Sequence, residues 1–340
     1  MTSPASMSAR KARVVVTHWV YPEVADYLAG FCDAVMPARD EGVWPRPRLA
    51  ELAADADGLM ACMADSIDEA FLAGCRRLRV VSATLKGYDN FDAEACTRRG
   101  VWLTIVPDTL IAPTGELAIG LVIGLMRRIT EGHGHVRGGG FAGWRPQLYG
   151  STLQGATVGV LGMGQLGQAV ARRLAGFESQ VVYHDARRLD AQTERVLAVS
   201  YHGLAQLAEA SDVIVVALPL TSQTRHLVDA PLLQHLRPGA FLVNVGRGSI
   251  VDEQAVANAL EAGRLGGYAA DVFAMEDWAL PGHPASVPHQ LLRHPRTLFT
   301  PHLGSAVDDV RRNMSLESAH QIRQVFEGRR PDHAVNAPRP

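Results

Sequence analysis

The chain has 340 residues, more than one hydrophobic core usually supports, so two domains are expected. Apolar residues make up 47% and charged residues 20%, and the formal net charge is −2. These values are typical of a globular protein and exclude strong non-specific attraction to nucleic acid or to an anionic membrane. The longest apolar run, 117–126, is too short to span a bilayer. The N-terminus lacks a signal-peptide pattern, and the four scattered cysteines lack metal-ligand spacing, so we expect a cytoplasmic protein without a metal.

The first 110 residues alternate between short apolar runs and amphipathic segments. Residues 1–11 are small and polar, and we expect them to be loose. The alternation that follows predicts a small domain with parallel strands. The strands are expected at 13–17, 33–36, 58–63, 80–83 and 101–104, and the helices at 22–29, 49–54, 69–73 and from the Asp92 cap to about 99.

The second part begins after Pro107 and Pro113 with a helix at 114–129 that is apolar on nearly every face. Such a helix is normally buried, and a second subunit could cover part of it, so a homodimer is expected. The Gly- and His-rich segment 132–140 is expected to be a loop with solvated histidines. Strands are then expected at 157–161, 180–184, 212–217, 241–245, 267–272 and 297–300, with helices at 165–175, 204–210, 232–236 and 253–262. A last helix, 306–327, would return to the first domain, and the tail after Gly328 is expected to be loose.

The segment 157–185 has the order strand, glycine turn, helix, strand and acid. The turn is Gly162-Met163-Gly164-Gln165-Leu166-Gly167, which has the G-x-G-x-x-G spacing. The first glycine allows the tight turn, the second lets backbone N–H groups approach a pyrophosphate, and the third lets the helix pack on the strand. Asp185 ends the second strand, where a carboxylate can accept both ribose hydroxyls. This arrangement predicts NAD binding.

The residues after Asp185 bear on the choice between NAD and NADP. The Asp185 carboxylate would repel the additional phosphate of NADP. Ala186 leaves room beside it, however, and Arg187 and Arg188 could attract that phosphate. We therefore expect a preference for NAD with some use of NADP.

Four further segments follow predicted strands, at the edge where open α/β sheets place their ligands. They are 85–90, 244–249, 270–277 and 300–305. Each contributes residue types with catalytic chemistry, although any one of them alone is more often structural. Their joint position beside the nucleotide fingerprint favours an active site.

These segments carry a family resemblance. NVGRGSIVDE, ADVF with a glutamate five residues after Asp271, and TPHLGS resemble the NAD-dependent D-2-hydroxyacid dehydrogenase superfamily. LKGYDNFD, VWLTIVPD, FAGWRPQLYGSTL, GGYAADVFAMEDW and LFTPHLGSAV are similar to its phosphonate (phosphite) dehydrogenase branch, and other members usually lack a lysine at position 86. The resemblance implies two doubly wound α/β domains with a cleft between them. A Rossmann nucleotide domain would span 111–302, and a discontinuous flavodoxin-like substrate domain 1–110 and 303–340.

The resemblance also implies a set of site residues. The implied catalytic residues are Arg247, Glu276, His302 and Lys86, and the implied substrate-binding residues are Lys86, Met63, Arg247, Arg311, Trp144 and Tyr149. The cofactor would be bound by the six residues of the glycine turn and by Asp185, Ala186, Pro219, Asp271 and Ser305. In chemical terms, Arg247 can grip a small oxyanion bidentately, and Glu276 can fix the tautomer of His302 as a proton-transfer group. His302, Arg247 and Lys86 all remain candidates for the base.

Three functions are compatible with this pattern. The first is oxidation of phosphite to phosphate with reduction of NAD, because three cations suit a small dianion. The second is reduction of a 2-keto acid, in which Arg247 grips the carboxylate and His302 protonates the carbonyl oxygen. The third is a non-catalytic NAD-sensing protein of the corepressor type that shares this fold. Lys86 and the segment 275–278 favour the first function.

Overall fold

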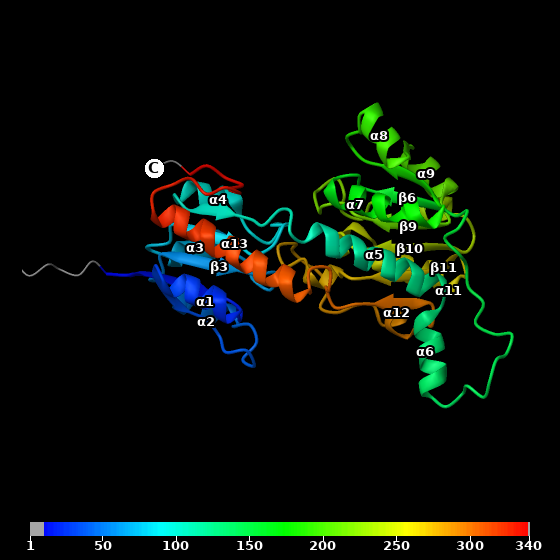
Figure 1. Cartoon of the computed structure of the whole chain (residues 1–340), viewed down its shortest axis with the longest axis horizontal. Coiled ribbons are helices and arrows are strands. Elements are labelled where there is room, and N and C mark those ends of the chain that lie inside the picture. The colour runs from blue at the N-terminus through cyan, green and yellow to red at the C-terminus, as the bar shows by residue number, and fades with distance from the viewer. Residues whose placement is uncertain (1–9, 339–340) are drawn as a thin grey trace, which may run out of the picture. The chain divides into compact units, whose positions relative to one another are not determined.

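The computed structural model describes residues 10–338, so most of the N-terminal segment expected to be loose lies outside the described residues. The chain forms two compact units (Figure 1). Unit 1 comprises residues 1–109 and 307–340, and unit 2 comprises residues 110–306. The substrate-binding role of unit 1 stays a prediction.

Unit 1 is built on a parallel sheet. Within residues 10–109 its strands have the order β2-β1-β3-β4-β5, which is the flavodoxin-like order. The strands are β1 (Ala12–Val16), β2 (Cys32–Val35), β3 (Gly58–Ala61), β4 (Val80–Ala83) and β5 (Trp102–Thr104). The helices are α1 (Pro22–Ala29), α2 (Arg46–Ala53), α3 (Glu69–Gly74), α4 (Ala93–Arg98) and, from the end of the chain, α13 (Asp308–Phe326). β3 and β4 are buried throughout, as strands covered on both faces must be.

The C-terminal segment completes unit 1. α13 crosses one face of the sheet (Figure 1), and Ile322 and Val325 pack into the same core as Val14 and Val16 of β1. The tail beyond it is not loose, so that expectation is wrong. The Asn336 side chain accepts the Leu103 N–H at 2.8 Å and donates to the Val101 carbonyl at 2.9 Å. These bonds satisfy backbone groups at the exposed edge of β5.

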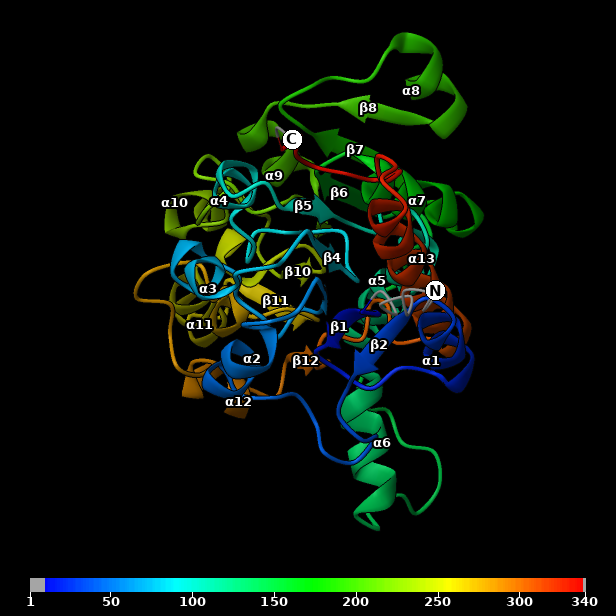
Figure 2. The same cartoon turned by 90° about the vertical axis from the view of Figure 1, so that its left-hand side faces the viewer.

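Unit 2 is built on a larger parallel sheet of order β12-β11-β10-β9-β6-β7-β8 (Figure 2). Read from β6, this is the Rossmann order with one further strand beyond β11. The strands are β6 (Thr157–Leu161), β7 (Gln180–His184), β8 (Val199–Tyr201), β9 (Val213–Val216), β10 (Ala240–Asn244), β11 (Leu265–Ala270) and β12 (Thr297–Phe299). The predicted fold class is confirmed.

The helices of unit 2 cover both faces of this sheet, as the two separate cores on its faces show. They are α5 (Ile111–Met126), α6 (Ile129–Arg137), α7 (Gln165–Leu174), α8 (Ala191–Leu197), α9 (Leu204–Ala210), α10 (Ala230–His235), α11 (Glu253–Glu261) and α12 (His289–Arg293), with short 3-10 turns η1 (Ala175–Phe177), η2 (Gly248–Ile250) and η3 (Ala274–Glu276). α8, β8 and α12 are elements that the sequence pattern did not predict.

Residues 132–137 of the segment 132–140, expected to be a loop, lie in the helix α6, so the expectation is wrong for these residues. Arg128 adopts a left-handed conformation, with φ of 54°, and this ends α5 and redirects the chain. Glu131 in the first turn of α6 then pairs with Arg128 and with Arg296 near β12. α6 and the loop after it stand away from the rest of unit 2 (Figure 1). No helix among residues 10–338 has both the length and the apolar composition needed to cross a lipid bilayer.

Candidate active site

The glycine turn between β6 and α7 has the geometry that a dinucleotide requires. Gly162 has a φ of 95°, and a Cβ at Gly167 would lie 2.0 Å from the Gly162 carbonyl oxygen. Only glycine fits these two positions. At Gly164, the N-cap of α7, a Cβ would meet nothing within 4 Å, so space is open in front of the helix N-terminus. The turn therefore has room for a pyrophosphate beside backbone N–H groups.

Asp185 lies at the end of β7, next to this turn. Its carboxylate accepts the Met163 N–H at 2.7 Å and the Arg187 N–H at 3.0 Å. The carboxylate is thus fixed beside the glycine turn, as a ribose-binding acid must be. Arg188 pairs with Glu194 at 2.9 Å. Of the two arginines after Asp185, Arg187 is therefore the better candidate to bind the additional phosphate of NADP.

The other predicted cofactor residues lie in the loops that follow unit 2 strands. Ala186 is exposed directly after Asp185, and Pro219 is exposed after β9, where its carbonyl accepts the Thr224 hydroxyl at 2.7 Å. Ser305 is half-buried in the loop after β12. These loops leave the carboxyl edge of the sheet, where Rossmann units bind ligands. The cofactor contacts of these residues stay predictions.

Glu276 and His302 form a hydrogen-bonded pair at the same edge. His302 Nδ1 lies 2.6 Å from a Glu276 oxygen, and the other Glu276 oxygen accepts the Phe273 N–H at 2.8 Å. Both side chains are about three-quarters buried, with 28% and 23% of their surface exposed. A carboxylate at Nδ1 fixes the proton there and leaves Nε2 as the proton acceptor.

The loop that carries His302 is held by Asp271. This carboxylate is buried and accepts hydrogen bonds from the Thr300 hydroxyl, at 2.6 Å, and from the N–H groups of Leu303 and Gly304. Burial raises the pKa of Asp271. His302 itself has a φ of 55°, a strained conformation for a non-glycine residue and one that clusters at functional sites. These hydrogen bonds hold the loop that carries His302 in place, and the contact of Asp271 with the cofactor stays a prediction.

Arg247 follows β10 in a turn packed tightly against the Glu276 turn. A Cβ at Gly248 would lie 1.8 Å from the Phe273 carbonyl carbon, so the two turns touch backbone to backbone. Asn244 braces the Arg247 turn by donating to the Arg247 carbonyl at 2.9 Å and accepting the Gly246 N–H at 3.0 Å. Unit 2 therefore brings Arg247, Glu276 and His302 into one cluster.

Unit 1 presents a second set of predicted residues. Met63 follows β3 and Lys86 follows β4, and these strands are parallel neighbours, so both residues lie at the carboxyl edge of the sheet. Met63 is partly buried against the core beneath. The Lys86 ammonium donates to the Pro107 carbonyl at 2.9 Å, and burial lowers the pKa of Lys86.

Arg311, on the first turns of α13, lies near the same edge. Burial lowers the pKa of its guanidinium, and the ionisable groups that act on it are Cys62 and Tyr21, neither of which is a carboxylate. His18, which follows β1, is a further residue at this edge that the sequence pattern did not indicate. Both His18 ring nitrogens are buried without a hydrogen-bond partner among the described residues, and burial with the Arg311 charge lowers the pKa of His18 to about 3. A buried cation beside an unpartnered imidazole suits an anionic ligand.

Trp144 and Tyr149 do not join the unit 2 cluster within one chain. Both are exposed, by 76% and 72%, in the loop after α6. That loop returns to the C-terminal end of α5, where the Ser151 N–H donates to Met126. The loop that carries His302 meets α5 near its other end, at Thr114, and a helix rises about 18 Å between Thr114 and Met126.

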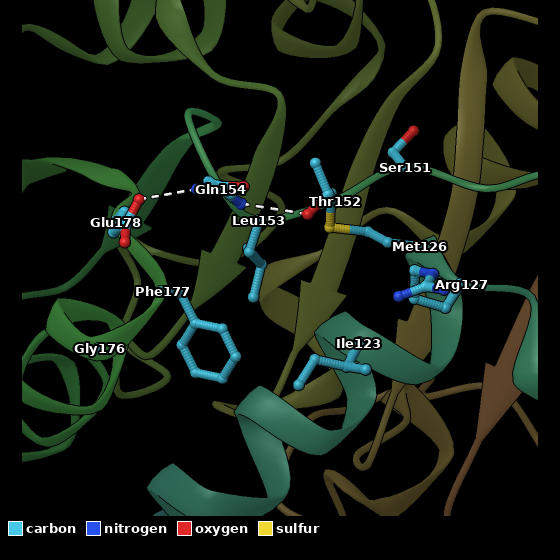
Figure 3. Close-up of a pocket in the computed structure, with 10 residues that line it drawn as sticks. All are labelled: Ile123, Met126, Arg127, Ser151, Thr152, Leu153, Gln154, Gly176, Phe177 and Glu178. Carbon is cyan, nitrogen blue, oxygen red and sulfur yellow. Dashed lines mark hydrogen bonds between the residues drawn. The ribbon is translucent and has the colours of Figure 1, made fainter.

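A cavity of about 300 Å³ opens elsewhere on unit 2 (Figure 3). Its walls come from the C-terminal end of α5 and from the segments that precede β6 and β7, including Ile123, Leu153 and Phe177. It therefore lies at the amino edge of the sheet. The candidate active-site residues lie at the carboxyl edge, so this cavity is not part of their site.

Comparisons with known proteins agree with this geometry. Residues 119–304 match the family model for the D-isomer specific 2-hydroxyacid dehydrogenase, NAD binding domain. The chain is 33% identical over 332 residues to a glyoxylate reductase of Aeropyrum pernix, which covers 96% of each chain. It superposes on a solved protein of Thermus thermophilus with a TM-score of 0.85 at 31% identity, covering 95% of this chain and 99% of that one.

A second solved structure is the NADPH-dependent glyoxylate/hydroxypyruvate reductase of Sinorhizobium meliloti in complex with NADP and malonate. It has a TM-score of 0.82 at 30% identity and covers 96% of this chain and 97% of that one. The family match spans more than half of the chain, and the expectation of an NAD-binding domain is confirmed. The chain belongs to the D-isomer specific 2-hydroxyacid dehydrogenase family and is an NAD-dependent dehydrogenase.

Proposed function

We propose that this dehydrogenase oxidises phosphite to phosphate. In the balanced reaction, phosphite, NAD and water give phosphate, NADH and a proton. The observation that carries the proposal is the concentration of cationic groups on the carboxyl edge of unit 1. In the proposal Lys86 and Arg311 of unit 1 would bind the substrate together with Arg247 of unit 2. Lys86 donates to the Pro107 carbonyl, and the ionisable groups that act on Arg311, Cys62 and Tyr21, are not carboxylates.

Charge balance favours a dianion for these cations. Phosphite carries close to two negative charges near neutral pH, whereas a keto acid such as glyoxylate carries one. Its few atoms give almost no apolar contact, so binding energy must come from charge-assisted hydrogen bonds. Arg247 supplies a planar fork of donors, and Lys86 supplies a compact charge. Arg311 adds a third cation whose burial is costly unless an anion joins it.

Water activation falls to the Glu276–His302 pair. The Glu276 carboxylate lies 2.6 Å from Nδ1 and would hold the proton there, so Nε2 would accept a proton from water as the water attacks phosphorus. Arg247 orients the phosphite oxygens for this attack. NAD, when bound, supplies the hydride acceptor. Gly162, Gly164, Gly167 and Asp185 would hold it, since the turn has open space for phosphates and a fixed carboxylate for the ribose.

A second candidate function is reduction of a 2-keto acid such as glyoxylate. The names of the relatives support this candidate better than phosphite oxidation, since those at 31–34% identity are glyoxylate reductases. Here Arg247 would grip the carboxylate, and protonated His302 would give its proton to the carbonyl oxygen. A monocarboxylate needs fewer cations than phosphite does, so this candidate gives Lys86 and Arg311 no direct role in substrate binding.

We also propose that the chain functions as a homodimer. Trp144 and Tyr149 are exposed at the far end of α5 from the His302 loop, so only a second copy would bring them to a substrate. Large exposed aromatic side chains on one projecting loop are typical of an association surface. Sedimentation of the purified chain tests the dimer.

One paired assay decides between the two substrates. The purified chain is given NAD with phosphite, and NADH formation is followed by absorbance; in parallel it is given NADH with glyoxylate, and NADH consumption is followed. The proposal expects kcat/KM for phosphite to exceed that for glyoxylate by at least about 100-fold, which corresponds to roughly 3 kcal/mol of differential transition-state binding. Faster turnover of glyoxylate would replace phosphite oxidation by the second candidate.

A further inference from the structure

The turn that carries Glu276 is clamped by carboxylates that the reaction itself does not use. η3 lies against η2 without a gap, because Gly248 has no room for a Cβ beside Phe273 and Ala274. Asp277, 2% exposed, accepts the Ser249 N–H at 2.8 Å and so ties the Glu276 turn to the Arg247 turn. A second such carboxylate comes from outside both turns.

Glu253 is that second carboxylate. It is the first residue of α11, it is 5% exposed, and it accepts the Ala274 N–H at 2.9 Å. The adjacent N–H, that of Phe273, donates to Glu276 at 2.8 Å. Glu253 and Glu276 therefore hold consecutive backbone N–H groups, and the position of this backbone decides where the Glu276 carboxylate meets His302.

The surroundings of Glu253 make its burial costly. The ionisable side chains that act on it are Asp277, Glu276 and Asp252, all acidic, and its own charge acts on buried Tyr268 of β11. Burial, with these neighbouring carboxylates, raises the pKa of Glu253 to about 7. Burying a carboxyl group next to other carboxylates costs free energy, so Glu253 is not expected to stabilise the fold by its charge. Its hydrogen bond to the Ala274 N–H offsets part of that cost.

We propose that Glu253 is a positioning residue for the active site: by holding the Ala274 N–H it aligns Glu276 with Nδ1 of His302. The inference rests on the proposed role of the Glu276–His302 pair in proton transfer. It concerns the placement of that pair and not the identity of the substrate.

Two substitutions separate positioning from simple stabilisation. Glu253→Gln keeps an amide oxygen that can accept the Ala274 N–H, whereas Glu253→Ala removes the acceptor. We expect Glu253→Ala to lower kcat at least about tenfold, with the dissociation constant for NADH unchanged, and Glu253→Gln to stay within about threefold of the native kcat. Glu253→Asp keeps the carboxyl group but shortens the side chain by one methylene, so the carboxyl group would no longer reach the Ala274 N–H. This variant replaces Glu253→Ala in the test if the alanine variant does not fold. Glu261→Ala, at the exposed end of the same helix, is the matched control.

A spectroscopic readout makes the test independent of turnover. A proton shared between His302 Nδ1 and Glu276 gives a far-downfield proton NMR signal, identified by its absence in His302→Asn. The signal should persist in Glu253→Gln and in Glu261→Ala and be lost or displaced in Glu253→Ala. Retention of this signal and of native kcat in folded Glu253→Ala or Glu253→Asp would overturn the inference. Equal loss in the glutamine and alanine variants would also overturn it, because the acceptor would then not be what matters. If the native chain turned over neither substrate, the proposed function would fail while the signal still decided the inference.

Discussion

The backbone contact between η2 and η3 predicts a large effect for the smallest possible substitution. In Gly248→Ala the new Cβ would lie 1.8 Å from the Phe273 carbonyl carbon and 2.0 Å from the Ala274 nitrogen. Ordinary contact begins at 3.4 Å, so the turns must separate by about 1.6 Å. That separation would move Arg247 away from the Glu276–His302 pair.

The expected cost falls on catalysis more than on folding. Overpacking of this kind costs about 1–3 kcal/mol of stability. A misplacement of about 1 Å in an active site can lower the rate about 100-fold, so kcat should fall by at least that factor. The glycine turn follows β6 and Asp185 follows β7, away from the new methyl group, so NADH affinity should remain close to native.

The kcat of Gly248→Ala is compared with that of the native chain in a steady-state assay. The assay follows NADH formation with phosphite or NADH consumption with glyoxylate, depending on which substrate the native chain turns over. Fluorescence titration of NADH and a thermal melt show that the variant is folded and binds its cofactor. Gly74→Ala is the control, because a Cβ there would meet nothing within 4 Å. A folded Gly248→Ala variant with kcat within threefold of native would refute the reasoning that the two turns act as one rigid support.

Four further predictions concern single side chains. His302→Ala should abolish turnover while NADH binding survives, because Nε2 is the proposed proton acceptor; near-native turnover would show that another group is the base. Lys86→Ala should raise the KM for phosphite by at least about tenfold, and an unchanged KM would remove Lys86 from the anion site. Asp185→Ala should shift the ratio of kcat/KM values toward NADP, whereas equal native values for both cofactors would count against Asp185 as the discriminator. The pKa of Glu253, about 7 in the folded chain against 4.5 for an ordinary glutamate, means that the folded chain holds an extra proton between these pH values; the free energy of unfolding should therefore fall by about 3 kcal/mol as the pH rises through this window. Urea unfolding at about pH 5 and about pH 8 should show this fall in the native chain and a smaller one in Glu253→Gln, and equal pH dependence would contradict it.

Sequence patterns predicted the parts of the fold that are determined by residues close together in the chain. The spacing of Gly162 and Gly167 reports steric limits that the backbone of the turn imposes by itself, and both limits are present in the structure. Apolar runs likewise predicted most strands, because burial on both faces leaves few polar positions.

Contacts between distant segments explain what the patterns missed. α6 contains glycines that argue against a helix, but Glu131 is held by Arg296, far along the chain. The polar composition of the tail predicts a loose segment, but the Asn336 side chain holds it by hydrogen bonds to the backbone at the edge of β5. Glu253 looks like an ordinary first-turn acid after the Asp252 cap, and only folding reveals that it is buried against the turn of Glu276. A family resemblance implied Trp144 and Tyr149 for the substrate site, yet the structure places both on an exposed loop at the other end of α5 from His302.

The contribution of α13 to unit 1 has a consequence for biosynthesis. β1 to β5 are synthesised before α13, but part of their core, including Ala319 and Ile322, lies on α13. Residues 110–306 are contiguous and can fold while translation continues. The first sheet must therefore wait, with apolar surface uncovered, until α13 emerges, and this interval is when a nascent chain would most need a chaperone.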